Sequence, residues 1–151
     1  MNMALFEVTW QLIEVTEPIN LALSVCWLGL AQAAFEYAGD GANAAWIRSL
    51  GLELVPSPDI YDSAQRAGRG HIEKTRVEYG LQHQAAEWRE EALRAFARAW
   101  ARLSKAERAT EADEVNQKGV EAFGHSAWSE ETANLVSSEE MEDYAGEGIM
   151  F

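Results

Sequence analysis

The sequence predicts a mainly α-helical fold, a compact helical domain arranged around one buried apolar helix over residues 18–38. Two observations predict it. The longest apolar run has helix length and helix end signals, and residues 81–103 carry an apolar stripe at helical spacing. With 151 residues and 48% hydrophobic content, the chain fits a single domain, 1–151. A chain of this length buries roughly 68–70% of its unfolded surface.

The central helix is predicted from a stretch without charge. Residues 18–35 contain no charged side chain, Thr16 is a suitable N-cap, and Pro18 stands where a first-turn proline is tolerated. Gly39 follows as a stop signal. At about 1.5 Å per residue, the 21 residues form a helix about 31 Å long. Because nearly every face is apolar, we expect the helix to be buried.

The same helix also reaches the roughly 20 residues that a bilayer requires. However, residues 1–47 contain five acids and neither Lys nor Arg, so the positive-inside signal is missing. We therefore favour a core helix over a membrane span. The single cysteine, Cys26, excludes an intramolecular disulfide and fits a reducing, cytoplasmic location.

A small two-stranded β element is expected beside the helices. Residues 4–15 alternate between apolar and polar side chains, which is strand periodicity, although a helical stripe is also present there. Residues 52–55 are short and apolar and would be the partner strand. Two strands alone are marginally stable, so they would have to pack on the helices.

Glycine and proline divide the middle of the chain. A short helix is predicted over residues 43–50, ended by Gly51, and another begins at Ser57 and Pro58 and runs to Ala67. Glycines within residues 68–70 are expected to interrupt it before a helical segment over 71–79.

The longest amphipathic helix is predicted over residues 81–103. A capping-box spacing at Ser104 predicts a further helix that ends near Gly119. Ser129 and Ser137 each precede acidic residues and suggest two short helix starts, and residues 137–151 form an acidic tail that we expect to be loosely ordered. The apolar stripe of the long helix is formed by Leu81, Ala85, Trp88, Ala92, Phe96, Trp100 and Leu103.

Charge is the strongest compositional feature. The net charge is −13, and residues 109–151 hold eleven acids and one base, whereas residues 48–108 hold nine acids and eleven bases. Such a field repels nucleic acid and anionic membranes and attracts basic partners in a salt-dependent way. An acidic surface that only keeps the protein soluble is the simpler alternative.

No enzyme or metal signature is present. His83 and Glu87 share a helix face, but the chain has no Glu-x-x-His, no His-Glu-x-x-His and no paired-cysteine spacing, so no metal and no cofactor are predicted. A Gly-x-Ser-x-Gly nucleophile motif is also missing. We lean toward a protein that is not an enzyme.

Two basic groups need partners. Arg66, Arg69 and His71 combine cations with glycines, as an anion-binding loop does, although pairing with the protein's own acids is the simpler interpretation. Arg94, Arg98, Arg102, Lys105 and Arg108 form a basic run along the long helix, and like charges one turn apart repel. We expect the acidic C-terminal third to compensate this run.

The leading functional hypothesis is a non-enzymatic acidic module that binds a basic protein through its C-terminal third. Its sharpest form is an inhibitor from a phage or mobile element that mimics nucleic acid and occupies the nucleic-acid-binding surface of its target. Trp128 and Tyr144, which lie among the acids, would anchor the interface. The predicted partner-binding residues are Glu111, Asp113, Glu114, Trp128, Glu130, Glu131, Glu139, Glu140, Glu142, Asp143 and Tyr144.

Two further hypotheses stay open. The protein is alternatively a structural or adaptor subunit that associates through apolar surface, in which case high salt would not weaken its association. The third hypothesis is an enzyme whose site has no linear motif, near Arg66, Arg69 and His71. Self-association is compatible with each of them.

Overall fold

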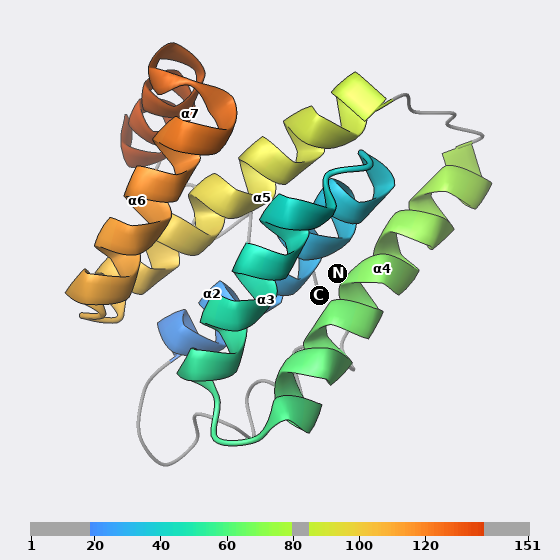
Figure 1. Ribbon diagram of the computed structural model, residues 1–151, viewed down its shortest axis with the longest axis horizontal. Helices are drawn as coiled ribbons and strands as arrows, with labels where there is room; N and C mark the ends of the chain where they lie inside the picture. Colours follow the sequence, from blue (N-terminus) through green and yellow to red (C-terminus); the bar gives the residue numbers. More distant parts are fainter. Residues whose placement is uncertain (1–18, 80–84, 138–151) are drawn as a thin grey trace.

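The computed structural model describes residues 19–79 and 85–137, with the side chains of 75–79 excepted. Over these residues the chain is helical and contains no strand, which confirms the predicted mainly α fold (Figure 1). The helices are α2 (Ile19–Tyr37), α3 (Gly41–Leu54), α4 (Pro58–Tyr79), α5 (Ala85–Lys105), α6 (Ala109–Phe123) and α7 (His125–Ser137).

Helix α2 is the centre of the domain, as predicted. Helices α3, α4 and α5 pack against it, and 14 of its 19 residues are buried. Gly39, with φ of +80°, follows the helix and turns the chain toward α3. By length and composition α2 is also apolar enough to cross a membrane, but its side chains are covered by neighbouring helices. This burial is that of a core helix.

The predicted interruption at residues 68–70 is wrong, because α4 runs through it without a break. Gly68 lies against the backbone of α2, where an added Cβ would come within 3.0 Å of the Leu30 Cα. Gly29 of α2 faces α4 in the same way, and its Cβ would lie 3.0 Å from the Ala64 carbonyl carbon. The two glycines therefore let α2 and α4 approach each other closely, and Gly68 is a packing residue rather than a stop signal.

The predicted end of a helix at Gly51 is also wrong, and so is the strand over residues 52–55. Helix α3 continues to Leu54, and Val55 is its C-cap. Gly51 receives the ring of Tyr61, whose Cε1 would lie 2.1 Å from an added Cβ. Ile47, Leu50 and Leu54 are buried at spacings of three and four residues, which is the periodicity of a helix and not of a strand. The partner strand predicted at residues 4–15 lies outside the described residues.

The helix predicted to start at Ser104 begins five residues later. Helix α5 continues through Lys105, and the Ser104 hydroxyl donates to the Trp100 carbonyl oxygen at 3.0 Å instead of capping a new helix. The chain then turns at Glu107, with φ of +60°, and α6 begins at Ala109.

Helix α6 passes the predicted end at Gly119 and stops at Phe123, where Gly124 adopts φ of +91°. Helix α7 starts directly after this glycine and not at Ser129. Ser137 is its last residue, and the helix predicted to begin there lies outside the described residues. The connection of one residue places α6 and α7 side by side as a hairpin that packs on α5 (Figure 1).

Candidate functional site

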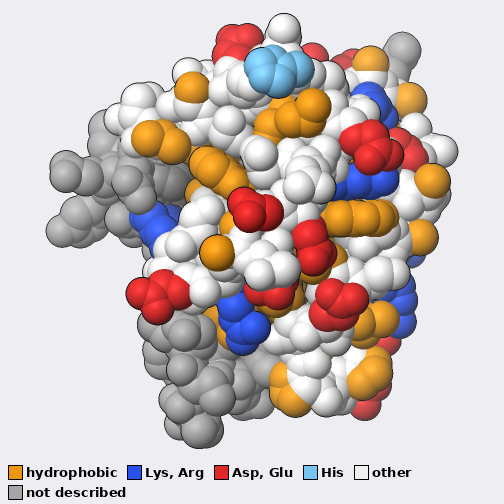
Figure 2. Space-filling model, turned by 60° about the vertical axis from the view of Figure 1, so that its left-hand side comes forward, with side chains coloured by type: hydrophobic (Ala, Val, Ile, Leu, Met, Phe, Trp, Pro, Cys, Tyr) orange, Lys and Arg blue, Asp and Glu red, His pale blue; other side chains and the backbone are white. Residues whose placement is uncertain are grey.

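The α6–α7 hairpin carries the predicted acidic residues that the structure describes. Asp113, Glu114 and Glu130 are exposed, and Glu111 and Glu131 are half-buried. Figure 2 turns this side of the molecule forward and shows acidic side chains gathered near the middle of the face. The remaining predicted residues, Glu139, Glu140, Glu142, Asp143 and Tyr144, lie outside the described residues.

For most of these carboxylates, the described part of the chain contains no ion-pair partner. Among the described residues, no ion pair involves Glu111, Asp113, Glu114 or Glu130, whereas Glu131 lies 4.0 Å from Arg98. The one base of the hairpin, Lys118, is engaged by Glu121 at 3.2 Å, and its ammonium lies 5.5 Å from the centre of the Trp46 ring. The hairpin therefore presents uncompensated negative charge to solvent.

Trp128, predicted as an anchor for a partner, is a core residue of the hairpin. It is only 1% exposed, and its indole N–H donates to the Asn116 side-chain oxygen at 2.8 Å. Its ring stacks on Phe123 at an interplanar angle of 7° and fills the space above Gly119. A ring held in this way has no surface to offer a partner, so we leave Trp128 out of the candidate interface.

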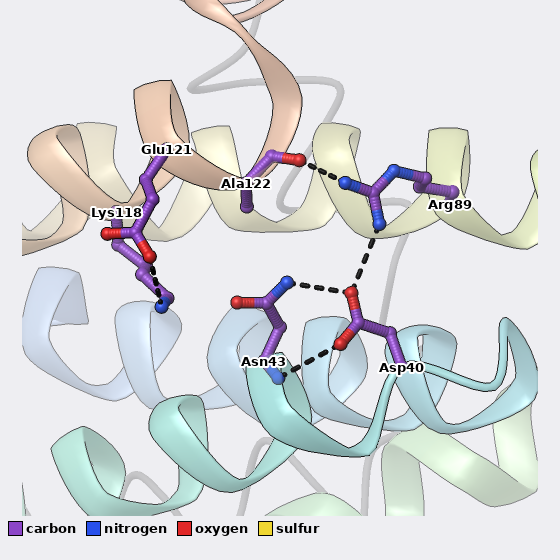
Figure 3. A network of polar contacts seen from close by, with 6 residues as sticks. All are labelled: Asp40, Asn43, Arg89, Lys118, Glu121 and Ala122. Atoms are coloured by element: carbon purple, nitrogen blue, oxygen red, sulfur yellow. Dashed lines mark hydrogen bonds and ion pairs between the residues drawn. The ribbon is translucent and has the colours of Figure 1, made fainter.

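A polar clamp fixes the hairpin to the rest of the domain (Figure 3). Arg89 of α5 donates both to the carbonyl oxygen of Ala122, near the end of α6, and to the carboxylate of Asp40 at 3.1 Å. Asp40 is the N-cap of α3 and accepts from the Asn43 backbone N–H at 3.1 Å and from the Asn43 side-chain amide at 2.7 Å. The Arg89 guanidinium also lies 5.4 Å from the centre of the Phe123 ring.

The electrostatics of the clamp follow from these contacts. Partial burial alone would raise the pKa of Asp40, but the hydrogen bonds from Asn43 and Arg89 outweigh it and hold the pKa below its usual value. Asp40 is therefore ionised at neutral pH, and one guanidinium links the start of α3 to the end of α6. The acidic face is thus displayed on a hairpin with a fixed position.

Three residues of the predicted basic run, Arg98, Arg102 and Lys105, line a pocket between α2, α5 and α7. The volume of the pocket is about 180 Å³. Arg98 lies 5.5 Å from the centre of the Trp27 ring, and Arg102, 5% exposed, donates to the Asn20 side-chain oxygen at 3.0 Å. The Arg98–Glu131 contact confirms that the C-terminal third helps to compensate the basic run. The pocket is lined by Trp27, Arg98, Trp100, Ala101, Arg102, Ser104, Lys105, Leu135 and Val136.

Sequence reasoning found the cations of this pocket but missed the pocket itself. The arginines recur every four residues on α5, which is visible in the sequence. Trp27 comes from α2 and Leu135 from α7, and their arrival at the same place depends on how three helices cross. Hydrophobic periodicity gives no signal for that convergence.

The residues of the alternative site, Arg66, Arg69 and His71, all lie on α4. Arg69 pairs with Glu36 of α2, and Arg66 donates to the Ser63 hydroxyl at 3.3 Å on its own helix. Burial lowers the pKa of His71. Arg69 therefore pairs with one of the protein's own acids, as the simpler interpretation predicted, whereas the described bond of Arg66 is to a hydroxyl.

No metal-binding group emerges from the described part of the chain, where no three His, Cys, Asp or Glu side chains are arranged to hold an ion. His83, considered above as part of a metal site, lies outside the described residues. Cys26 is a buried free thiol in α2.

Comparisons of the chain with protein-family models, with curated protein sequences and with solved structures find no match. Assignment of function therefore depends on the chemistry of the described surface.

Proposed function

We propose that the protein is a non-enzymatic acidic binding module that docks its α6–α7 hairpin on a basic surface of a partner protein. The observation that supports the proposal is the clustering on α6 of acids that have no described ion pair. On the remaining helices, Arg48 pairs with Asp62, Arg69 with Glu36, and Arg94 with Glu91. On α6, Glu111, Asp113 and Glu114 have no ion pair among the described residues and lie within one turn of each other, whereas the acids without a described ion pair on α3, α4 and α5 are spread over three helices.

The spacing of these acids suits a basic groove. Side chains three residues apart on a helix, such as Glu111 and Glu114, have Cβ atoms about 5–6 Å apart. Phosphates along one nucleic-acid strand are separated by several ångström, so a protein surface that holds phosphates can also hold such a row of carboxylates. In its sharpest form the proposal is an inhibitor that occupies the nucleic-acid-binding surface of its target, of the kind that phages and mobile elements produce.

The test uses two variants with the same loss of charge. In the hairpin variant, Glu111→Gln, Asp113→Asn and Glu114→Gln neutralise the acids of α6. In the control variant, Glu53→Gln, Asp59→Asn and Glu90→Gln neutralise three acids on the surface of α3, α4 and α5, which likewise have no described ion pair. Each set removes two Glu and one Asp, and each includes one acid from the first turn of its helix.

The experiment is a pull-down from nuclease-treated lysate at about 50 mM and about 500 mM salt, because screening at high salt weakens contacts between exposed charges. The expected result is a nucleic-acid-binding protein that is captured at low salt by the wild type and the control variant but lost with the hairpin variant. Equal capture by the two variants would contradict the proposal. A partner retained at high salt would favour the adaptor hypothesis instead.

A further inference from the structure

The pocket between α2, α5 and α7 combines apolar side chains with positive charge. Trp27 and Trp100 supply flat apolar surface, and Arg98, Arg102 and Lys105 place three cations along one helix. A groove of this composition recognises carboxylates that are followed by an apolar side chain, because guanidinium and ammonium groups bind the acid while indole rings cover the neighbouring apolar group.

The chain itself supplies such a segment at the rim of this pocket. Val136 lines the pocket and is 60% exposed, and α7 ends at Ser137, the next residue. The sequence that follows, residues 138–151, contains five acids and neither Lys nor Arg, together with Met141 and Tyr144. A fully extended chain advances at most about 3.6 Å per residue, so the first acids after Ser137 are restricted to within about 10 Å of it.

We propose that this pocket is the binding site for the chain's own acidic C-terminal segment, residues 138–151. Charge complementarity and covalent attachment both favour this occupant. A tether of a few residues gives an effective concentration in the millimolar range, whereas a separate acidic peptide would have to approach a protein of net charge −13. In the proposed complex, acids of residues 138–151 neutralise the cations of the pocket, and the apolar side chains among these acids cover the indole surface.

The proposal is distinct from docking of the α6–α7 hairpin and is tested without any partner. The test is zero-length carbodiimide cross-linking of the full chain, followed by peptide mapping. The carbodiimide adds to a carboxylic acid to give an O-acylisourea. The neutral amine of a nearby lysine attacks its acyl carbon, which forms the amide and releases the urea derived from the carbodiimide. The chain has only three lysines, Lys74, Lys105 and Lys118, which keeps the map simple. The Lys118–Glu121 ion pair, at 3.2 Å, is the internal positive control.

The expected product joins Lys105 to an acid within residues 139–143. Its yield should fall several-fold at about 1 M salt, because the Debye length is then about 3 Å and the attraction between the charges is screened. In a mixture of ¹⁴N and ¹⁵N chains, the product should contain a single isotope. Formation of the control amide without the Lys105 product would overturn the proposal. So would a mixed-isotope product, which shows a second copy in the pocket, or a product of Lys105 with an acid in residues 1–18.

A second readout does not depend on Lys105. Neutralisation of four acids by Glu139→Gln, Glu140→Gln, Glu142→Gln and Asp143→Asn leaves the described helices unaltered in sequence. In ¹H–¹⁵N spectra, the indole N–H signals of Trp27 and Trp100 should shift in this variant, whereas those of Trp46 and Trp128 should stay in place. Unchanged Trp27 and Trp100 signals would overturn the proposal.

Discussion

The contact between Gly119 and Trp128 gives the sharpest test of how the hairpin is built. A Cβ added at Gly119 would lie 2.3–2.5 Å from three atoms of the indole ring, well inside the 3.5–4.0 Å of normal carbon contacts. The ring has little room to move, because Phe123 stacks on it, the centre of the Phe96 ring lies 5.6 Å away, and Asn116 holds its N–H. Gly119→Ala therefore forces overpacking.

The magnitude follows from three contributions. Overpacking of a filled core costs about 1–3 kcal/mol, and loss of the indole hydrogen bond costs about 1 kcal/mol. Replacement of glycine by alanine inside a helix stabilises the helix by about 1 kcal/mol. We expect a net destabilisation of about 2 kcal/mol, which corresponds to a fall in Tm of roughly 4–8 °C for a chain of this size.

The matched control is Gly70→Ala on α4. Gly70 is an exposed helix residue with no atom within 4 Å of an added Cβ, so alanine should stabilise the protein by about 0.5–1 kcal/mol. Thermal and urea unfolding followed by circular dichroism measures both variants. If Gly119→Ala is as stable as Gly70→Ala, Trp128 is not held where the structure places it.

Three further outcomes follow from the polar contacts. Asp40→Ala should cost about 1 kcal/mol through loss of the α3 cap, whereas Asp40→Asn keeps a capping oxygen and loses only the charge that Arg89 binds. Contacts in the fold lower the pKa of Asp40, so its ionisation stabilises the fold above about pH 4. In urea unfolding, the free energy of unfolding of the wild type should exceed that of Asp40→Asn by more at pH 7 than at pH 3. Burial raises the pKa of Tyr61, so the neutral phenol stabilises the fold below about pH 10, and this stabilisation is lost as the pH rises further. Tyr61→Phe also removes the 2.8 Å hydrogen bond to Gln32. In the same assay, this variant should lose less stability at alkaline pH than the wild type does.

How much of this fold could be predicted depends on which signal each residue carries. The central helix could be predicted, since an uncharged apolar run of this length has few alternatives. The glycines led to wrong predictions of where helices end. Three glycines resemble helix stop signals in the sequence but lie inside helices: Gly51, Gly68 and Gly119. At each of them, an aromatic ring or the backbone of a neighbouring helix occupies the space that a side chain would need. A glycine needed for packing cannot be distinguished from one needed for a turn until the crossing element is known.

The candidate site divides in the same way. The acidic character of α6 is a local property of the sequence, and so is the basic run on α5. The burial of Trp128 could not be predicted from its sequence neighbours, because an indole among acidic residues is compatible with both an exposed anchor and a buried core residue. Its ring packs directly over Gly119, where a side chain would clash with it, and stacks on Phe123.

The two charged surfaces place different demands on the fold. Arg102 lies at the basic pocket and is 5% exposed. Burying a cation on folding costs solvation free energy, and this cost is offset only when hydrogen bonds or acids surround the cation. Asp113 and Glu114 are exposed and keep their hydration, so the domain folds without any need to compensate them. Acids that folding does not require to be paired remain available for an external cation. For this reason we propose that the α6–α7 hairpin recognises another protein and that the pocket binds a segment of the chain itself.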